Sequence, residues 1–209
     1  MNKVTVLRKQ SYFLYMILSD REIKKEIKER NIVEVEGDKP GLNMETQLGP
    51  SSFDLRLGYD FGILNTRKVE MVDTKCMEKY QKYINEEKHS AEEGVIVHPG
   101  EFILGSTLET VNIPNEVVGR VEGRSSYGRL GIIIHATAGF IDPGFKGQIT
   151  LEIQNLGNAP VKIYPEERIC QIVFEKMGSE ADTPYGKKKD SKYMRQKGAT
   201  FSKLEKEKR

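Results

Sequence analysis

The amino-acid sequence predicts a mainly β protein, either a barrel or a sandwich of short strands. After residue 50, runs of β-branched and other apolar residues recur, separated by Gly, Pro and Asn. The 209 residues are 37% hydrophobic and 31% charged, a balance that suits one folded domain over residues 1–209. The predicted strand regions read GPSSFDLRLG, GVIVHPGEFILGSTLE, EVVGRVEGR, GIIIHATAGFI, GQITLEIQN, APVKIYP and ERICQIVFEKM.

One short helix is predicted before these strands. Ser19 and Glu22 have the spacing of a capping box, and Ile23 and Ile27 follow one turn apart among charged residues. We therefore expect an amphipathic helix over residues 20–30. The apolar run YFLYMIL before it is too short to span a membrane, and no small-residue cleavage site follows it. We expect neither a targeting signal nor a membrane segment.

Two segments are predicted to lie outside the β core. Residues 69–93 form a polar, charged insert with weak strand character and some helical patterning. Residues 187–209 contain ten Lys or Arg and three Asp or Glu, which gives them a net charge of +7, whereas the rest of the chain carries −5. We expect residues 185–209 to form a mobile basic arm.

The two cysteines, Cys76 and Cys170, are far apart in the sequence. There is no CxxC spacing and no pair of histidines, so the sequence indicates neither a disulfide framework nor a zinc site. This cysteine usage fits a reducing cytoplasm.

The stretch GRSSYGRLG, residues 123–131, carries many hydrogen-bond donors on a flexible loop. Arg124 and Arg129 offer forked cationic donors that suit phosphate, Ser125 and Ser126 add hydroxyl groups, and the glycines allow backbone amides to approach a ligand. A polyphosphate would satisfy all of them. These nine residues alone fit equally well a solvated basic turn with a serine at the start of a helical turn.

Two acidic residues downstream of this loop, Glu152 and Asp142, are candidate functional residues. In ITLEIQN the strand alternation places Glu152 on the face opposite Ile149, Leu151 and Ile153. A glutamate in mid-strand is disfavoured, and an exposed sheet face would be sufficient compensation for it. Asp142 begins the turn sequence DPG and fits a purely turn-forming role equally well. His135 is more simply explained as a hydrogen-bonded structural residue than as a base.

Taken together, these motifs resemble the dCTP deaminase family, within the trimeric dUTPase-like superfamily. The resemblance rests on GRSSYGRLG, HATAGFIDPGFKGQITLEIQN and PYGKKKDSKYMRQKG, and it is supported by ILSDREIKKEI and GPSSFDLRLG. It covers residues 17–198, with the insert 69–93 as a departure. It implies a distorted jelly-roll-like β barrel of the dUTPase type, assembled as a homotrimer with active sites at the subunit interfaces.

The resemblance also implies roles for individual residues. Glu152 would be the catalytic acid and base, and Arg129 would orient water or steady developing charge. Asp142 and the backbone at Ala138 would border the base and the sugar. The loop residues implied at the phosphates and the reacting end of the nucleotide are Ser125, Ser126 and Arg129. The arm residues implied to close over the triphosphate are Tyr185, Lys192 and Gln196.

Hydrolytic deamination requires water to attack C4 of cytosine, a proton to reach the ring nitrogen, and ammonia to leave. Most nucleobase deaminases activate this water with zinc held in an HxE…PCxxC pattern, which this sequence lacks. A route without zinc requires a shielded carboxylate that accepts the water's proton and passes it on, and Glu152 is the candidate. Mg²⁺ would enter bound to the triphosphate of dCTP or dUTP.

Alternatives to a simple dCTP deaminase remain at this stage. A dUTP diphosphatase would use an Asp142-type residue to direct water at the α-phosphorus. A bifunctional relative would perform both steps and release dUMP, and HATAGFIDPG resembles such members, because strict deaminases tend to have His and Arg at the positions of Gly139 and Phe140. A non-enzymatic binder of nucleic acid or another acidic partner would use the basic arm, with the β domain as a scaffold, but no nucleic-acid recognition motif accompanies the arm. We expect no nucleic-acid partner and no membrane partner.

Overall fold

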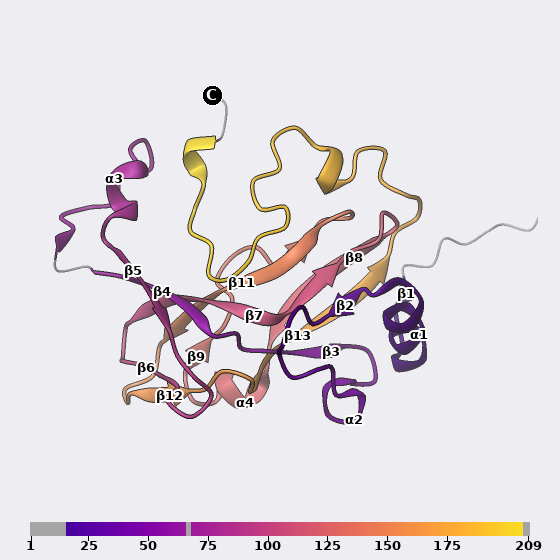
Figure 1. Cartoon of the computed structure of the whole chain (residues 1–209), viewed down its shortest axis with the longest axis horizontal. Helices are drawn as coiled ribbons and strands as arrows, with labels where there is room; N and C mark the ends of the chain where they lie inside the picture. The colour runs from indigo at the N-terminus through magenta and orange to yellow at the C-terminus, as the bar shows by residue number, and fades with distance from the viewer. Residues whose placement is uncertain (1–15, 66–67, 207–209) are drawn as a thin grey trace, which may run out of the picture.

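A computed structural model describes residues 16–65 and 68–206. Two antiparallel β-sheets dominate it, as the sequence predicted (Figure 1). The six-stranded sheet has the order β5-β4-β7-β11-β9 with β2 on β7, and the five-stranded sheet has the order β1-β13-β8-β10 with β3 on β13. Strands β6 and β12 form a separate pair.

The strands of the six-stranded sheet are β2 (Val33–Glu34), β4 (Asp60–Leu64), β5 (Ile84–Lys88), β7 (Phe102–Asn112), β9 (Ile132–Ile133) and β11 (Lys146–Asn155). Those of the five-stranded sheet are β1 (Met16–Ile17), β3 (Phe53–Arg56), β8 (Val117–Gly123), β10 (Phe140–Ile141) and β13 (Arg168–Lys176). The separate pair is β6 (Val95–Val97) with β12 (Val161–Ile163).

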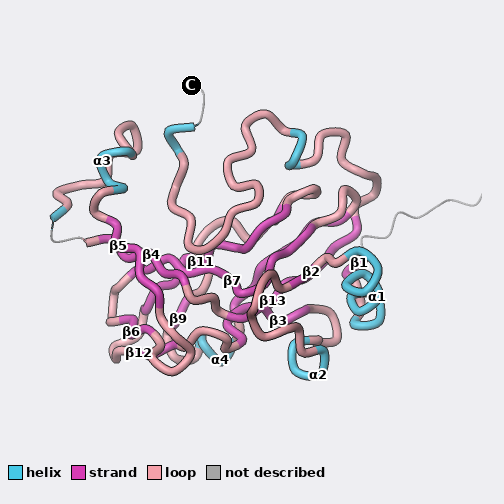
Figure 2. The backbone as a smooth tube through the Cα atoms, viewed as in Figure 1, coloured by secondary structure: helices cyan, strands magenta, loops and turns pink. Residues whose placement is uncertain are grey.

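The helices are short and lie at the edges of the sheets (Figure 2). Among the described residues, none is long and apolar enough to cross a membrane. The α-helices are α1 (Asp20–Arg30), α2 (Met44–Gln47), α3 (Glu78–Gln81) and α4 (Ser125–Gly128), and the 3₁₀ turns are η2 (Tyr185–Lys187) and η3 (Leu204–Lys206).

Helix α1 confirms the prediction for residues 20–30. Its N-terminal cap is formed by the Glu22 carboxylate, which accepts hydrogen bonds from the backbone N and the Oγ of Ser19. The helix ends at Asn31, whose φ of 51° lies in the left-handed region that terminates helices. Ile23 is fully buried and anchors the helix to the core.

The hydrophobic core lies between the two sheets and draws on strands from both. Strand β11 shows why its sequence forms an amphipathic strand, because Leu151 and Ile153 are fully buried while Glu152 between them is partly exposed. Its longest pairing is with β7, where Glu152 lies opposite Leu104. The core therefore fixes the direction in which Glu152 points. The largest fully buried core side chains include Phe53, Leu55, Leu57, Phe61, Ile103 and Phe174.

The two segments predicted to lie outside the core both reach the sheets. Within the insert, β5 pairs with β4 and extends the edge of the six-stranded sheet, although none of the insert's described residues joins the main buried cluster. Residues 195–200 of the arm lie along β11 and form hydrogen bonds with it, whereas the mobility expected of residues 185–209 stays a prediction. Figure 1 shows the yellow arm and α3 of the insert at the upper edge of the molecule.

Candidate active site

Glu152 is held in one orientation by the loop that precedes β10. Its Oε2 accepts hydrogen bonds from the backbone N of Ala136 at 2.9 Å and of Thr137 at 3.2 Å. The Nδ1 of His135 lies 3.8 Å from the same oxygen. Within the described residues, the other oxygen, Oε1, accepts no hydrogen bond. One carboxylate oxygen is thus fixed, and the other is available to a ligand or a water molecule.

Glu152 lines a cavity of about 580 Å³. Its walls come from the six-stranded sheet, from β8 and β10 of the other sheet, from the insert and from the arm. Four of the other predicted site residues line the same cavity: Ala138, Asp142, Tyr185 and Gln196. Together with Glu152 they come from three separate parts of the sequence, which the fold brings together.

Asp142 lies on the turn that leads into β11. The turn is closed by the backbone N of Phe145, which donates to the Asp142 carbonyl at 3.1 Å, and Gly144 has a φ of 78°. The predicted turn role of DPG is therefore present. The Asp142 carboxylate is exposed and has no hydrogen bond or ion pair to the described part of the chain. The turn positions Asp142 in the cavity without using its charged group.

The arm closes the cavity with aromatic and amide side chains. The Tyr185 ring packs edge-on against Phe145, with centroids 5.7 Å apart. The Nε2 of Gln196 donates to the Gln148 carbonyl at 2.8 Å, while its Oε1 is buried and has no partner among the described groups. Lys192 is not among the cavity-lining residues, and its Nζ lies 5.8 Å from the centroid of the Tyr193 ring.

Sequence reasoning missed Tyr193. Its ring lines the cavity, its backbone N donates to the Tyr185 hydroxyl at 3.1 Å, and its own hydroxyl accepts from the backbone N of Lys203. His135 also lines the cavity, although it was predicted to be a hydrogen-bonded structural residue. The repeated Tyr in PYGKKKDSKY was the available signal, because two aromatics on a basic arm suit packing beside a ligand.

The loop at residues 123–131 lies elsewhere in the molecule. It forms α4, which lies at the lower edge of Figure 1, opposite the arm. Arg124 occupies the N-cap position, so the two serines form the first turn and do not cap it. Ser126 and Arg124 line a second, more open cavity of about 680 Å³, whereas Ser125 and Arg129 line neither cavity.

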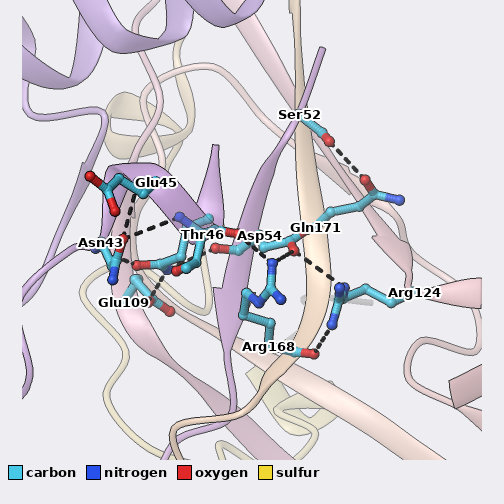
Figure 3. A network of polar contacts seen from close by, with 10 residues as sticks. Asn43, Glu45, Thr46, Ser52, Asp54, Glu109, Arg124, Arg168 and Gln171 are labelled. Atoms are coloured by element: carbon cyan, nitrogen blue, oxygen red, sulfur yellow. Dashed lines mark hydrogen bonds and ion pairs between the residues drawn. The ribbon is translucent and has the colours of Figure 1, made fainter. Parts of the chain in front are cut away.

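The side chain of Arg124 is tied to β3 and β13 (Figure 3). Its Nε lies 3.2 Å from Oδ2 of Asp54, and its Nη1 donates to the carbonyl of Arg168 at 2.8 Å. Burial raises the pKa of the Asp54 carboxyl, and the guanidinium groups of Arg124 and Arg168 offset part of that rise. These contacts anchor the start of the loop.

A second contact anchors the far side of α4. The Tyr127 hydroxyl donates to Oε2 of Glu167 at 2.8 Å. Burial, together with this hydrogen bond to a carboxylate, raises the pKa of Tyr127, so the hydroxyl keeps its proton and remains a donor. By contrast, Arg129 is exposed and makes no ion pair or side-chain hydrogen bond with the rest of the described chain. The loop is thus anchored at Arg124 and Tyr127, and Ser125, Ser126 and Arg129 on it are exposed.

Within residues 16–65 and 68–206, no group of three or more His, Cys, Asp or Glu side chains is arranged to hold a metal ion. The fold and the cavity define a small antiparallel β enzyme whose two carboxylates, Glu152 and Asp142, face one substrate-sized space.

Comparison with known proteins gives the family. A family model described as dCTP deaminase-like matches residues 17–177, which is most of the chain. The chain belongs to this family, as its motifs predicted.

Two relatives and one solved structure illustrate the similarity. A protein of Dictyoglomus turgidum named "dCTP deaminase, dUMP-forming" is 52% identical over 192 residues, covering 90% of this chain and 95% of the relative. A protein of Methanosphaera stadtmanae with the same name is 48% identical, covering 90% and 93%. The 2′-deoxycytidine 5′-triphosphate deaminase structure from Agrobacterium tumefaciens has a TM-score of 0.60 at 23% identity. It is matched over 78% of this chain and 47% of its own length, and it supports the fold.

Proposed function

We propose that this protein deaminates dCTP and, in the same active site, hydrolyses the product to dUMP and pyrophosphate. One observation carries the proposal: the Glu152 carboxylate is fixed through one oxygen, open at the other, and shares its cavity with the unpaired carboxylate of Asp142. Relatives that match this chain over nine-tenths of its length are named dUMP-forming.

In the deamination step, Oε1 of Glu152 accepts a proton from water as the water oxygen bonds to C4 of cytosine. Glu152 delivers that proton to the ring nitrogen N3. It then takes the proton of the new C4 hydroxyl and passes it to the amine, so that the C4–N bond breaks, ammonia leaves and a C4 carbonyl remains. The backbone amides of Ala136 and Thr137 hold Oε2 throughout, so the carboxylate does not rotate away from the base. The net reaction consumes one water and converts dCTP into dUTP and ammonia.

In the second step, Asp142 directs a water molecule at the α-phosphorus of dUTP. The bond between that phosphorus and the bridging oxygen breaks, and dUMP and pyrophosphate are released. Mg²⁺ bound to the triphosphate of the substrate would neutralise part of the negative charge on the phosphates. Tyr185, Lys192 and Gln196 on the arm contact the nucleotide from the side opposite the sheet, and the backbone at Ala138 borders the base.

A neighbouring subunit of a homotrimer supplies the remaining groups of this site, which are Arg124, Ser125, Ser126 and Arg129. In one chain none of them lines the Glu152 cavity, and α4 lies at the edge opposite the arm in Figure 1. Such an arrangement completes the triphosphate site only when a second copy brings its own loop to the cavity. The positive charge of Arg129, unpaired within the described chain, then faces the phosphates or the reacting water.

The test is a product analysis of purified protein incubated with Mg²⁺ and dCTP, with dUTP in a parallel tube. The bifunctional reaction gives ammonia and pyrophosphate from dCTP in a ratio of about one, with dUMP as the nucleotide product. Accumulation of dUTP without pyrophosphate would restrict the activity to deamination. Reaction in the dUTP tube alone would assign the protein as a dUTP diphosphatase and refute the role of Glu152.

A further inference from the structure

The arm follows β11 through hydrogen bonds at every second residue. The Gln196 carbonyl accepts from the backbone N of Gln148 at 3.1 Å, and the backbone N of Gly198 donates to Oε1 of Gln148 at 2.7 Å. The backbone N of Thr200 donates to the Thr150 hydroxyl at 3.2 Å. Gln148 is buried, so the arm covers this part of the strand in the manner of an added edge segment.

Phe201, the next residue, packs directly on Gly62 of β4. A Cβ atom at position 62 would lie 2.8 Å from Cε1 and 3.1 Å from Cε2 of the Phe201 ring. Any side chain at position 62 would therefore displace the ring.

The backbone conformation does not require glycine at position 62. Gly62 pairs with Leu104 of β7 on one side and Glu86 of β5 on the other, and its φ does not lie in the left-handed region. Glycine in the interior of a strand weakens it, because glycine loses more conformational freedom and contributes no packing. The space that Gly62 leaves for the Phe201 ring compensates for this weakening of the strand.

The contact between Gly62 and Phe201 lies on the wall of the cavity that holds Glu152. Gln196, five residues before Phe201, lines the same cavity. The arm is thus fixed at both ends of the stretch that faces Glu152, by the bonds to β11 and by the ring on β4.

We propose that Phe201 is a positioning residue whose ring packs in the space left by Gly62. The contact between these two residues, here called the latch, holds the arm over the cavity of its own chain. The latch acts through Gln196 and its neighbours and not by contact with the nucleotide. Its kinetic consequence rests on the proposed function, whereas its structural consequence does not.

The experiment compares full-length Gly62→Ala, Phe201→Ala and the double variant with the unaltered protein. The rate of tryptic cleavage after Arg195 and Lys197 reports how often the arm leaves the sheet. Gly41→Ala is the matched control, because Gly41 is exposed and a Cβ there would meet no atom within 4 Å.

We expect each single latch variant to increase the cleavage rate about tenfold, the factor that corresponds to losing part of the burial of one aromatic side chain. Gly62→Ala should not lower Tm, because alanine suits a strand at least as well as glycine does. The double variant should be cleaved no faster than Phe201→Ala alone, since the clash disappears with the ring. The KM for dCTP should rise more than kcat falls.

Unchanged cleavage in both single variants would overturn the latch, and so would independent, multiplicative effects in the double variant. A higher KM for Phe201→Ala at an unchanged cleavage rate would also overturn it, because the ring would then act on the substrate. If the latch variants are cleaved faster but the unaltered protein releases no ammonia from dCTP, the latch is supported and the proposed function is refuted.

Discussion

At the scale of single residues, the two carboxylate oxygens of Glu152 have different environments, one suited to positioning the group and the other to proton transfer. Two backbone amides hold Oε2, while Oε1 accepts no hydrogen bond from the described residues, and Glu152 lines the cavity. A side chain that only decorated a solvated sheet face would not need a loop to fold back and donate two amides to it. The geometry fits a group that must keep its position while a proton moves through it.

Replacing Glu152 with Gln removes the proton carrier and keeps the shape of the side chain. We expect ammonia release from dCTP to fall at least about 100-fold, while the Kd for dCTP changes only a few-fold. Steady-state ammonia assays and calorimetric titration with dCTP and Mg²⁺ measure the two quantities. Glu29→Gln on α1 is the control. Normal ammonia release by Glu152→Gln would remove this residue from the mechanism.

At the scale of secondary-structure elements, a buried ion pair joins β3 to β7. The Nε of Arg56 lies 2.6 Å from Oε1 of Glu109, and the backbone N of Arg56 donates to Oε2 at 2.8 Å. Gln47 of α2 donates to the same carboxylate at 2.8 Å. Glu109 is fully buried, so its charge depends on these partners for the interactions that water would otherwise supply.

Truncation of Glu109 to Ala leaves the buried guanidinium of Arg56 without its counter-ion. We expect the free energy of unfolding to fall by about 3–5 kcal/mol. Denaturant unfolding measures this quantity. The matched control is Glu29→Ala, which breaks an exposed 3.9 Å contact with Lys25 and should change stability by less than about 1 kcal/mol. Equal effects of the two substitutions would show that the buried pair adds nothing.

The attachment of α1 to the turn between β7 and β8 gives a prediction about pH. Nη1 of Arg30 lies 2.6 Å from Oε1 of Glu116, and this hydrogen bond lowers the pKa of Glu116 below its ordinary value of 4.5. A carboxyl group whose pKa is lower in the folded state contributes stability above 4.5 and loses that contribution as pH falls below it.

Glu116→Gln should therefore be less stable than the unaltered protein at pH 6, by less than about 1 kcal/mol because the pair is partly exposed. The difference should shrink as the pH is lowered below 4.5. Urea titrations at a series of pH values measure it. A difference that stays constant from pH 6 to pH 3 would show that the charge of Glu116 is not responsible.

At the scale of the whole molecule, the residues implied in one active site lie on two separate surfaces of the chain. Glu152 faces the cavity beneath the arm, and Arg129 follows α4 on the opposite edge in Figure 1. The proposed homotrimer brings these surfaces together, so each site takes its carboxylate from one subunit and its arginine from another.

Mixing subunits tests this arrangement. Glu152→Gln and Arg129→Ala should each be inactive as pure proteins. After denaturation and refolding as an equal mixture, about three quarters of random trimers contain both variants, and one site in three of each is intact. About one quarter of the original ammonia release should therefore return. Co-refolding each variant with itself is the control, and no recovery in the mixture would place both residues in the site of one chain.

Much of the fold was predictable because its determinants are local. Turn residues separate the strand-forming runs, and the capping box of Ser19 and Glu22 defines the start of α1. The alternation of apolar residues in ITLEIQN predicted the facing of Glu152, and the buried Leu151 and Ile153 confirm it. Family membership was predictable for another reason, since several motifs occurred in a fixed order.

The sequence by itself determined the β architecture, the first helix and the family, because periodicity, capping and motif spacing operate over a few neighbouring residues. Glu152 and Asp142 were singled out by the family resemblance and not by these patterns. Only the tertiary structure decided which residues share a cavity and which do not. Arg129 and Glu152 look like one constellation in the sequence but lie on different surfaces, whereas Gly62 and Phe201, 139 positions apart, are in contact. Such pairs depend on sheet pairing and on the path of the arm, which no local pattern encodes.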